Sequence, residues 1–280
     1  MPSPPVPSWR PTSSCPHRDR RRWSAGRSEE RRMATFLLIH GASHGGWCWE
    51  KVVPLLEARG HRALAPDLPG SGEDHDTPLS AVSLAGYVDF VSKILDKEAE
   101  PAILVGHSLG GLTITHAAEA RRRKVRALVY LSALLPPPGM SGRDVTAREA
   151  DALMRRSREY GGDGRTYSFK RSNVPALFYN DCDPDDVYKA MARLRPQAAA
   201  ISATPMVYTE ERFGSVPRWY IECLRDNAIT LSMQRWMLQQ TPCKVLTLDS
   251  GHSPFLSMPD TLVERLETVA RDSVERETIA

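Results

Sequence analysis

The chain has 280 residues, 41% hydrophobic and 25% charged, a composition typical of a soluble globular protein and long enough for one large α/β domain with an insertion. Its formal net charge of +3 arises in residues 1–32, which carry eight Arg and three acidic residues, so the remainder is at −2. This distribution argues against a nucleic-acid partner. No apolar run approaches the ~18 residues that span a bilayer, so no membrane partner is predicted.

Residues 1–32 are rich in Pro, Ser and Arg and lack the apolar core of a secretion signal. They hold too few apolar residues to bury a core, so we interpret them as a disordered basic N-terminal extension, with Met33 as a candidate for the true start. The five cysteines are scattered and include no C-x-x-C pair, which argues against a disulfide framework and a zinc site. A cytoplasmic location is therefore predicted.

From Met33 onward, short apolar runs alternate with segments of helical periodicity, a pattern that predicts a mostly parallel, doubly wound α/β sheet. The predicted elements, in chain order, are a strand over 34–39, a helix over 49–56 that Gly60 ends, a strand over 62–65, a helix over 84–95, a strand over 102–106, a helix over 109–120, a strand over 125–133, a strand over 219–224, a helix over 231–239, a strand over 244–248 and a final helix around 262–269.

The alternation stops at a Pro-Pro-Pro-Gly run over 136–139 and returns near 218. We therefore predict a core made of 33–135 and 218–280, and a mostly helical cap, or lid, over 136–217 without strand character. Within the cap, 145–156 has a helical pattern. Asp183-Pro184 is typical of an N-cap followed by a first-turn proline.

Residues 105–111 read Val-Gly-His-Ser-Leu-Gly-Gly and follow an apolar strand directly. This is a G-x-S-x-G nucleophile elbow, in which a strand turns sharply into a helix and raises the Ser108 hydroxyl above the sheet. Glycines on both sides of Ser108 suit so tight a turn, because a Cβ there would clash. The motif predicts a nucleophilic serine at position 108.

A serine hydroxyl needs a base and the base needs an orienting acid, which follow the serine along the chain in the order acid, then histidine. Asp226 comes after the strand 219–224 and His252 after the strand 244–248, as this order requires. Asp249 is the alternative acid, since it also stands at a strand end and is close to His252 in sequence. We predict a triad of Ser108, Asp226 and His252.

A tetrahedral intermediate needs two N–H donors beside the nucleophile. The amide of Leu109 opens the helix after Ser108, and the amide of Ala42 comes from the Gly-rich loop after the first strand, so we predict these two as the oxyanion hole. We expect His40 and His44 to organise this loop through hydrogen bonds. His107 is expected to point away from the Ser108 hydroxyl.

Together these residues resemble a group within the α/β-hydrolase superfamily that contains plant methylesterases, plant hydroxynitrile lyases and bacterial carboxylesterases, including pyrethroid hydrolases. The resemblance runs from about Met33 to the C-terminus. The matching stretches are 37–47 (LLIHGASHGGW), 53–61 (VPLLEARGH), 106–111 (GHSLGG), 211–216 (ERFGSV), Asp226 and 234–236 (QRW).

The resemblance implies an α/β-hydrolase fold, the triad Ser108, Asp226 and His252, and oxyanion donors at Ala42 and Leu109. The lyases that this chain resembles carry threonine where Gly41 stands and lysine where Ser253 stands. Those two groups bind the cyanohydrin hydroxyl and the departing cyanide in the lyases, so their replacement here disfavours lyase chemistry.

We therefore expect a serine carboxylesterase, without cofactor or metal, that acts on small to medium apolar or aryl carboxylic esters, pyrethroid-type esters included. The candidate walls of its substrate pocket are Leu134, Phe178, Tyr179 and Met206, which could instead be packing between cap and core. The alternatives are a lactonase or lyase-like activity at the same site, or a low-turnover receptor for a small ligand. A monomer or homodimer with a small-molecule ester substrate is expected.

Overall fold

The central feature of the computed structural model is a six-stranded sheet in which every neighbouring pair of strands is parallel. Residues 1–2, 33–149 and 151–279 are described, with the backbone alone from 274 onward, so the predicted extension lies almost wholly outside them. The predicted α/β fold is confirmed. The strands in spatial order are β2 (Arg62–Leu64), β1 (Thr35–Ile39), β3 (Ala102–His107), β4 (Val125–Leu131), β8 (Arg218–Cys223) and β9 (Lys244–Leu248).

The register of the sheet brings the carboxyl ends of its central strands to one edge. Ile39 of β1 pairs with Gly106 of β3, which pairs with Tyr130 of β4, which pairs in turn with Tyr220 of β8. Every residue of β3 is buried, as expected for an inner strand of a parallel sheet covered on both faces. The loops that follow these four strands therefore open at the same place, where such sheets bind ligands.

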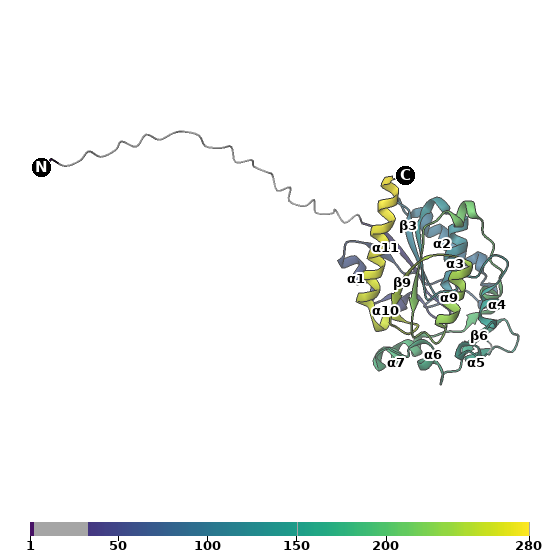
Figure 1. Cartoon of the computed structure of the whole chain (residues 1–280). Helices are drawn as coiled ribbons and strands as arrows, with labels where there is room; N and C mark the ends of the chain where they lie inside the picture. The colour runs from purple at the N-terminus through teal and green to yellow at the C-terminus, as the bar shows by residue number, and fades with distance from the viewer. Residues whose placement is uncertain (3–32, 150, 280) are drawn as a thin grey trace. The chain divides into compact units, whose positions relative to one another are not determined.

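Helices cover both faces of the sheet, with α1 packed against α11 on one face and α2 packed against α3 on the other (Figure 1). Ser83 begins α2 by accepting a hydrogen bond from the backbone N–H of Gly86, and Gly60 follows α1 with a left-handed φ of 84°. The elements outside the cap are the helices α1 (Val52–Ala58), α2 (Leu84–Lys97), α3 (Gly110–Ala120), α9 (Leu231–Gln240), α10 (Pro254–Ser257) and α11 (Pro259–Ile279), and the short 3-10 turns η1 (Gly46–Trp49), η2 (Leu79–Ala81) and η3 (Arg122–Lys124).

The segment 136–217, which we call the cap segment, connects β4 to β8, and its helices α5, α6 and α7 gather at one end of the sheet (Figure 1). Asp183 caps α7 as predicted, since its side chain accepts from the backbone N–H of Asp185. The elements of the segment are α4 (Gly142–Ala147), α5 (Leu153–Ser157), β5 (Arg158–Tyr160), β6 (Thr166–Phe169), α6 (Val174–Phe178), α7 (Pro184–Arg193), β7 (Gln197–Ala198), α8 (Ala199–Ala203) and a π-helical turn, η4 (Glu210–Gly214).

Two expectations for the cap segment are wrong. It does contain strands, because β5, β6 and β7 form a three-stranded antiparallel sheet. These strands have two to four residues, and their one sequence signal is the alternation that buries Tyr167 and Phe169 on the same face of β6. The helix predicted over 145–156 is two separate helices, α4 and α5, and a capping box between Ser141 and Asp144 starts the first of them early.

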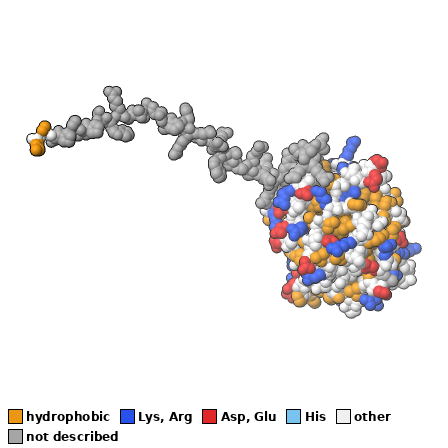
Figure 2. Space-filling model, in the orientation of Figure 1, with side chains coloured by type: hydrophobic (Ala, Val, Ile, Leu, Met, Phe, Trp, Pro, Cys, Tyr) orange, Lys and Arg blue, Asp and Glu red, His pale blue; other side chains and the backbone are white. Residues whose placement is uncertain are grey.

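The surface carries no strong field of one sign on the face shown in Figure 2, where Lys and Arg side chains alternate with Asp and Glu side chains among hydrophobic ones. This agrees with the small net charge calculated for the chain after residue 32. Within the described ranges, no helix combines the length and the apolar character that crossing a bilayer requires.

One buried side chain fastens the loop after β8 to α9. The Gln234 amide nitrogen donates to the carbonyls of Cys223 and Ile229 at 3.1 and 2.7 Å, and its oxygen accepts from the Cys223 N–H at 3.0 Å. Gln234→Leu leaves three buried backbone groups without partners, so we expect it to lower the free energy of unfolding by about 3 kcal/mol. Urea denaturation measures this. The exposed Gln239→Leu on the same helix is the control, and equal losses in the two variants would contradict the assignment.

Candidate active site

Ser108 lies on a strained turn between β3 and α3, with a left-handed φ of 53° that non-glycine residues rarely adopt. The turn is tight enough to exclude side chains around it. A Cβ added at Gly41 would lie 2.8 Å from the Ser108 Cβ, and one at Gly110 would lie 2.8 Å from the carbonyl oxygen of His40. Close approach therefore requires glycine both in the motif, at Gly110, and in the loop after β1, at Gly41. Ser108 itself is 6% exposed.

His252 and Asp226 form a buried pair beside this turn. The His252 Nδ1–H donates to Asp226 Oδ2 at 2.7 Å, and both side chains are almost completely buried. The other carboxylate oxygen, Oδ1, accepts from the backbone N–H groups of Ala228 and Ile229 at 2.6 and 3.0 Å, and the Ser132 hydroxyl also donates to Oδ2. Four donors thus hold the carboxylate, and the bond at Nδ1 leaves His252 Nε2 unprotonated in the neutral ring.

The rival acid, Asp249, is placed differently. Its side chain is 75% exposed and pairs with the Arg225 Nε at 2.9 Å, while Asp226 is the carboxylate bonded to His252. Among the described residues, no hydrogen bond joins the Ser108 hydroxyl to His252. Such catalytic bonds are commonly long without substrate and shorten when it binds.

His107 lies against the histidine of this pair. Its ring centroid lies 4.5 Å from that of His252, and its Nε2–H donates to the His252 carbonyl at 2.9 Å. The bond places His107 as a support for the loop that carries His252, and the expectation that its ring turns away from the Ser108 hydroxyl stays a prediction.

His40 fixes the peptide group that carries the predicted Ala42 donor. The Leu68 N–H donates to His40 Nε2 at 3.1 Å, so the proton of this neutral ring is on Nδ1, which donates to the Gly41 carbonyl at 2.9 Å. The Gly41 carbonyl and the Ala42 N–H belong to the same planar peptide. The hydrogen bond from His40 therefore sets the direction in which the Ala42 N–H points.

His44 holds the next peptide of the same loop and links it to the cap segment. Its Nδ1–H donates to the Ala42 carbonyl at 2.8 Å, and its Nε2 accepts from the Tyr179 hydroxyl, also at 2.8 Å. The ring stacks on Trp47 with centroids 5.2 Å apart. Both predicted roles of His40 and His44 in ordering the loop are confirmed by these bonds.

A small cavity of about 20 Å³, room for about one water molecule, lies beside Ser108. The two predicted oxyanion donors, Ala42 and Leu109, line it together with the predicted pocket residue Leu134. The remaining described residues in its wall come from the cap segment and from the loop after β8: Gly142, Thr146, Met154, Arg158, Tyr167, Phe169, Ser202 and Ile229.

The other three predicted pocket residues are buried but do not line this cavity. Phe178 packs against the His252 ring with centroids 5.5 Å apart, and Tyr179 bonds His44 as described. Met206 is buried and pairs its backbone N–H with the Met140 carbonyl. Sequence reasoning missed most of the actual wall, although the alternation of Tyr167 and Phe169 was a signal that it could have used.

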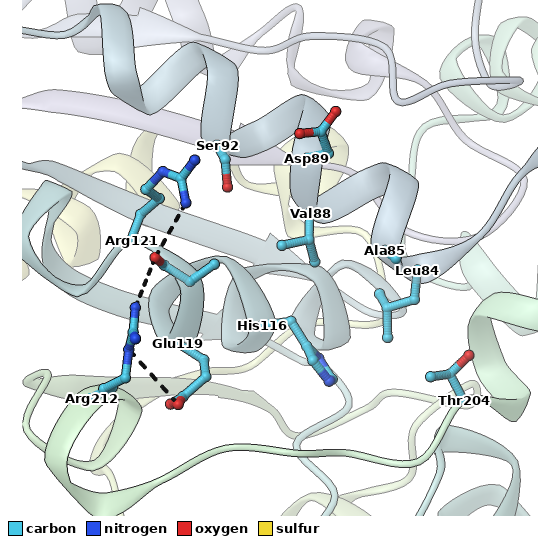
Figure 3. Close-up of a pocket in the computed structure, with 11 residues that line it drawn as sticks. Leu84, Ala85, Val88, Asp89, Ser92, His116, Glu119, Arg121, Thr204 and Arg212 are labelled. Atoms are coloured by element: carbon cyan, nitrogen blue, oxygen red, sulfur yellow. Dashed lines mark hydrogen bonds and ion pairs between the residues drawn. The ribbon is translucent and has the colours of Figure 1, made fainter.

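A larger hollow of about 510 Å³ lies away from the nucleophile, between α2, α3 and the cap segment (Figure 3). Its charged groups already have partners, within the hollow or next to it. Arg121 pairs with Asp96, Arg212 pairs with Glu119, and both arginines donate to the Ala120 carbonyl. Among the described residues, no group of three or more His, Cys, Asp or Glu side chains could hold a metal ion.

Burial keeps the histidines around the site neutral. Desolvation is the main cause that lowers the pKa of His44 to about 3, against a smaller opposing effect of its bond to Ala42. Desolvation also lowers the pKa of His40 and His107, and for His107 the nearby His252 and His44 act in the same direction. Neutral rings preserve the donor and acceptor roles described above.

These shifts predict a pH-dependent stability. Between pH 6.5 and pH 3 the unfolded chain binds a proton at His44 that the folded chain does not, so stability falls as the pH is lowered through this window. We expect wild type to lose about 2 kcal/mol more unfolding free energy than His44→Gln between pH 7 and pH 5. Denaturant titrations at the two pH values measure the difference, and identical losses would contradict a neutral buried His44.

The chain is similar to known proteins over most of its length. A sequence model of the α/β-hydrolase family matches residues 36–265. Methylesterase 2 of Arabidopsis thaliana is 32% identical over 259 residues, covering 87% of this chain and 98% of the relative. The pyrethroid hydrolase of Sphingobium wenxiniae is 34% identical over 246 residues, covering 84% of this chain and 86% of the relative.

Solved structures agree with these sequence relatives. A pyrethroid hydrolase from Sphingobium faniae superposes with a TM-score of 0.78 at 32% identity, covering 87% of this chain and 99% of that one. Tomato methylketone synthase I, complexed with 2-tridecanone, superposes with a TM-score of 0.78 at 27% identity, covering 86% and 99%. The chain belongs to the α/β-hydrolase family, and its relatives include proteins named methylesterase and pyrethroid hydrolase.

Proposed function

We propose that this protein is a serine carboxylesterase that works through an acyl-enzyme intermediate, with Ser108 as nucleophile, His252 as base and Asp226 as the orienting acid. The observation that carries the proposal is the buried bond between His252 Nδ1 and Asp226 beside the Ser108 turn. That bond orients the imidazole and stabilises the positive charge that develops on it when Nε2 takes a proton.

In the first half of the reaction, the Ser108 oxygen attacks the ester carbonyl and its proton passes to His252 Nε2. The negative charge that develops on the carbonyl oxygen is stabilised by the N–H groups of Ala42 and Leu109, which border the same cavity. His252 then protonates the alcohol oxygen as the C–O bond breaks, and the alcohol leaves. The acyl group stays on Ser108 as an ester.

In the second half, a water molecule attacks the acyl-enzyme and gives its proton to His252 Nε2. The same two amides stabilise the second tetrahedral intermediate. His252 returns the proton to the Ser108 oxygen as the bond to the acyl carbon breaks, so the carboxylic acid is released and the enzyme is restored. No cofactor or metal takes part in this scheme.

The walls of the cavity indicate the substrate class. Leu134, Met154, Phe169 and Ile229 present apolar surface beside the nucleophile, and the cavity is small. We infer that the substrates are small to medium apolar or aryl carboxylic esters, admitted when the cap segment moves. The relatives named methylesterase and pyrethroid hydrolase support this substrate class. A cytoplasmic location is also part of the proposal.

Substitutions in the proposed triad test the mechanism with p-nitrophenyl acetate. We expect Ser108→Ala to abolish turnover, because the nucleophile is lost. Asp226→Asn is expected to lower kcat by up to ~10⁴, since the amide stabilises neither the correct tautomer nor the imidazolium. Steady-state release of p-nitrophenol over many turnovers measures both effects.

Asp249→Asn is the matched control, because it removes the exposed carboxylate closest to His252 in sequence. Its activity is expected to equal that of wild type. Loss of activity in Asp249→Asn with full activity in Asp226→Asn would transfer the role of acid to Asp249. A single stoichiometric burst in wild type, without further turnover, would favour a receptor over an enzyme.

A further inference from the structure

A single charged side chain interrupts the otherwise neutral wall beside Ser108. Of the described residues that line the cavity, Arg158 alone is ionised, and it stands at the start of β5, immediately after α5. It is therefore the cap residue that brings a positive charge to the place where the substrate must lie. The proposed function, with its apolar ester substrates, gives this charge no role.

The guanidinium is held in place but is short of acceptors. Its central carbon lies 4.5 Å from the centre of the Tyr167 ring, a cation–π contact that fixes its plane, and Tyr167 itself is buried in the cavity wall. One terminal nitrogen donates weakly to the Tyr160 hydroxyl at 3.5 Å. Arg158 as a whole is half-buried, and of its nitrogens the Nε–H is the one that is buried without an acceptor.

An arginine that only covers a surface keeps all of its donors in water, with its stem against apolar neighbours, whereas the Nε–H of Arg158 is withdrawn from water. A buried N–H without an acceptor instead costs the desolvation of that group, and for a charged donor the cost is large. A ligand oxygen that accepts from the Arg158 fork removes this cost. The planar fork suits carboxylate and carbonyl oxygens in particular.

We propose that Arg158 selects esters that carry a second oxygen acceptor, a carboxylate or a ketone, a few bonds from the scissile carbonyl. This inference rests on the proposed function and narrows its substrate class. The apolar wall then holds the hydrocarbon between the two polar ends, while the Ala42 and Leu109 amides bind the reacting carbonyl.

Three ethyl esters of nearly equal shape test the selection: monoethyl succinate, ethyl levulinate and ethyl 4-methylpentanoate. They place a carboxylate, a ketone and an apolar isopropyl group at the same distance from the ester. We expect wild type to show a higher kcat/KM for the first two than for the third, by roughly tenfold to a hundredfold, as one hydrogen bond to a charged group supplies. The ratio of kcat/KM between monoethyl succinate and ethyl levulinate shows whether Arg158 prefers a charged or a neutral acceptor.

Arg158→Met removes the charge while keeping an unbranched stem, and we expect it to abolish the preference, so that kcat/KM for monoethyl succinate and for ethyl levulinate falls to the level of ethyl 4-methylpentanoate in the same variant. Arg158→Lys keeps the charge without the fork and is expected to retain part of the preference for monoethyl succinate. Arg156→Met, at an exposed position two residues away, is the matched control and should behave as wild type.

Equal rates for the three esters in wild type, or an equal loss for all three in Arg158→Met, would overturn the selection by Arg158. Activity of wild type on p-nitrophenyl acetate in either case would leave the proposed esterase intact. If wild type hydrolyses none of these esters, the binding of monoethyl succinate to Ser108→Ala, measured by calorimetry, tests the selection by Arg158 instead. Weaker binding to Ser108→Ala/Arg158→Met supports the selection, and equal or absent binding in both overturns it.

Discussion

The left-handed turn at Ser108 is the constraint on which the rest of the site depends. Such a φ strains the backbone of any residue that has a Cβ, and the surrounding fold must therefore hold Ser108 in place. The fold does so by close approach, because the loop after β1 passes so near that only glycine fits at position 41. Ala42 of that loop and Leu109, which follows the turn, line the same small cavity as Ser108, and their amides are the donors that we propose for the oxyanion.

Burial determines which ring nitrogen donates and which accepts in the hydrogen bonds around that turn. His40 and His44 are neutral because desolvation lowers their pKa, so each ring has one donor and one acceptor, and each joins the glycine-rich loop to a different neighbour. Leu68 fixes the first ring and Tyr179 of the cap segment fixes the second. The predicted oxyanion loop is thus held from the core and from the cap, which couples the position of the cap to the geometry of the site.

The fold and the residues of the proposed triad could be inferred from sequence because their signals are local. A buried strand, a G-x-S-x-G turn and an ordered series of strand ends identify Ser108, Asp226 and His252 without knowledge of distant contacts. The wall of the substrate pocket could not be predicted from the sequence, because it depends on which side chains of the cap segment contact the core. Strands as short as β5 and β6 have almost no periodicity to detect. The position of Arg158 in that wall follows from their pairing, which no local pattern encodes.

Covalent labelling of the active serine tests the central claim most directly. Treatment with diisopropyl fluorophosphate, followed by intact mass and peptide mapping, reports which hydroxyl is activated and how fast it reacts. The account predicts one phosphoryl group per chain, on Ser108, and labelling that is slower by roughly 10²–10⁴ in His252→Ala because the base is lost. Modification spread over other serines, or an unchanged rate in His252→Ala, would contradict it.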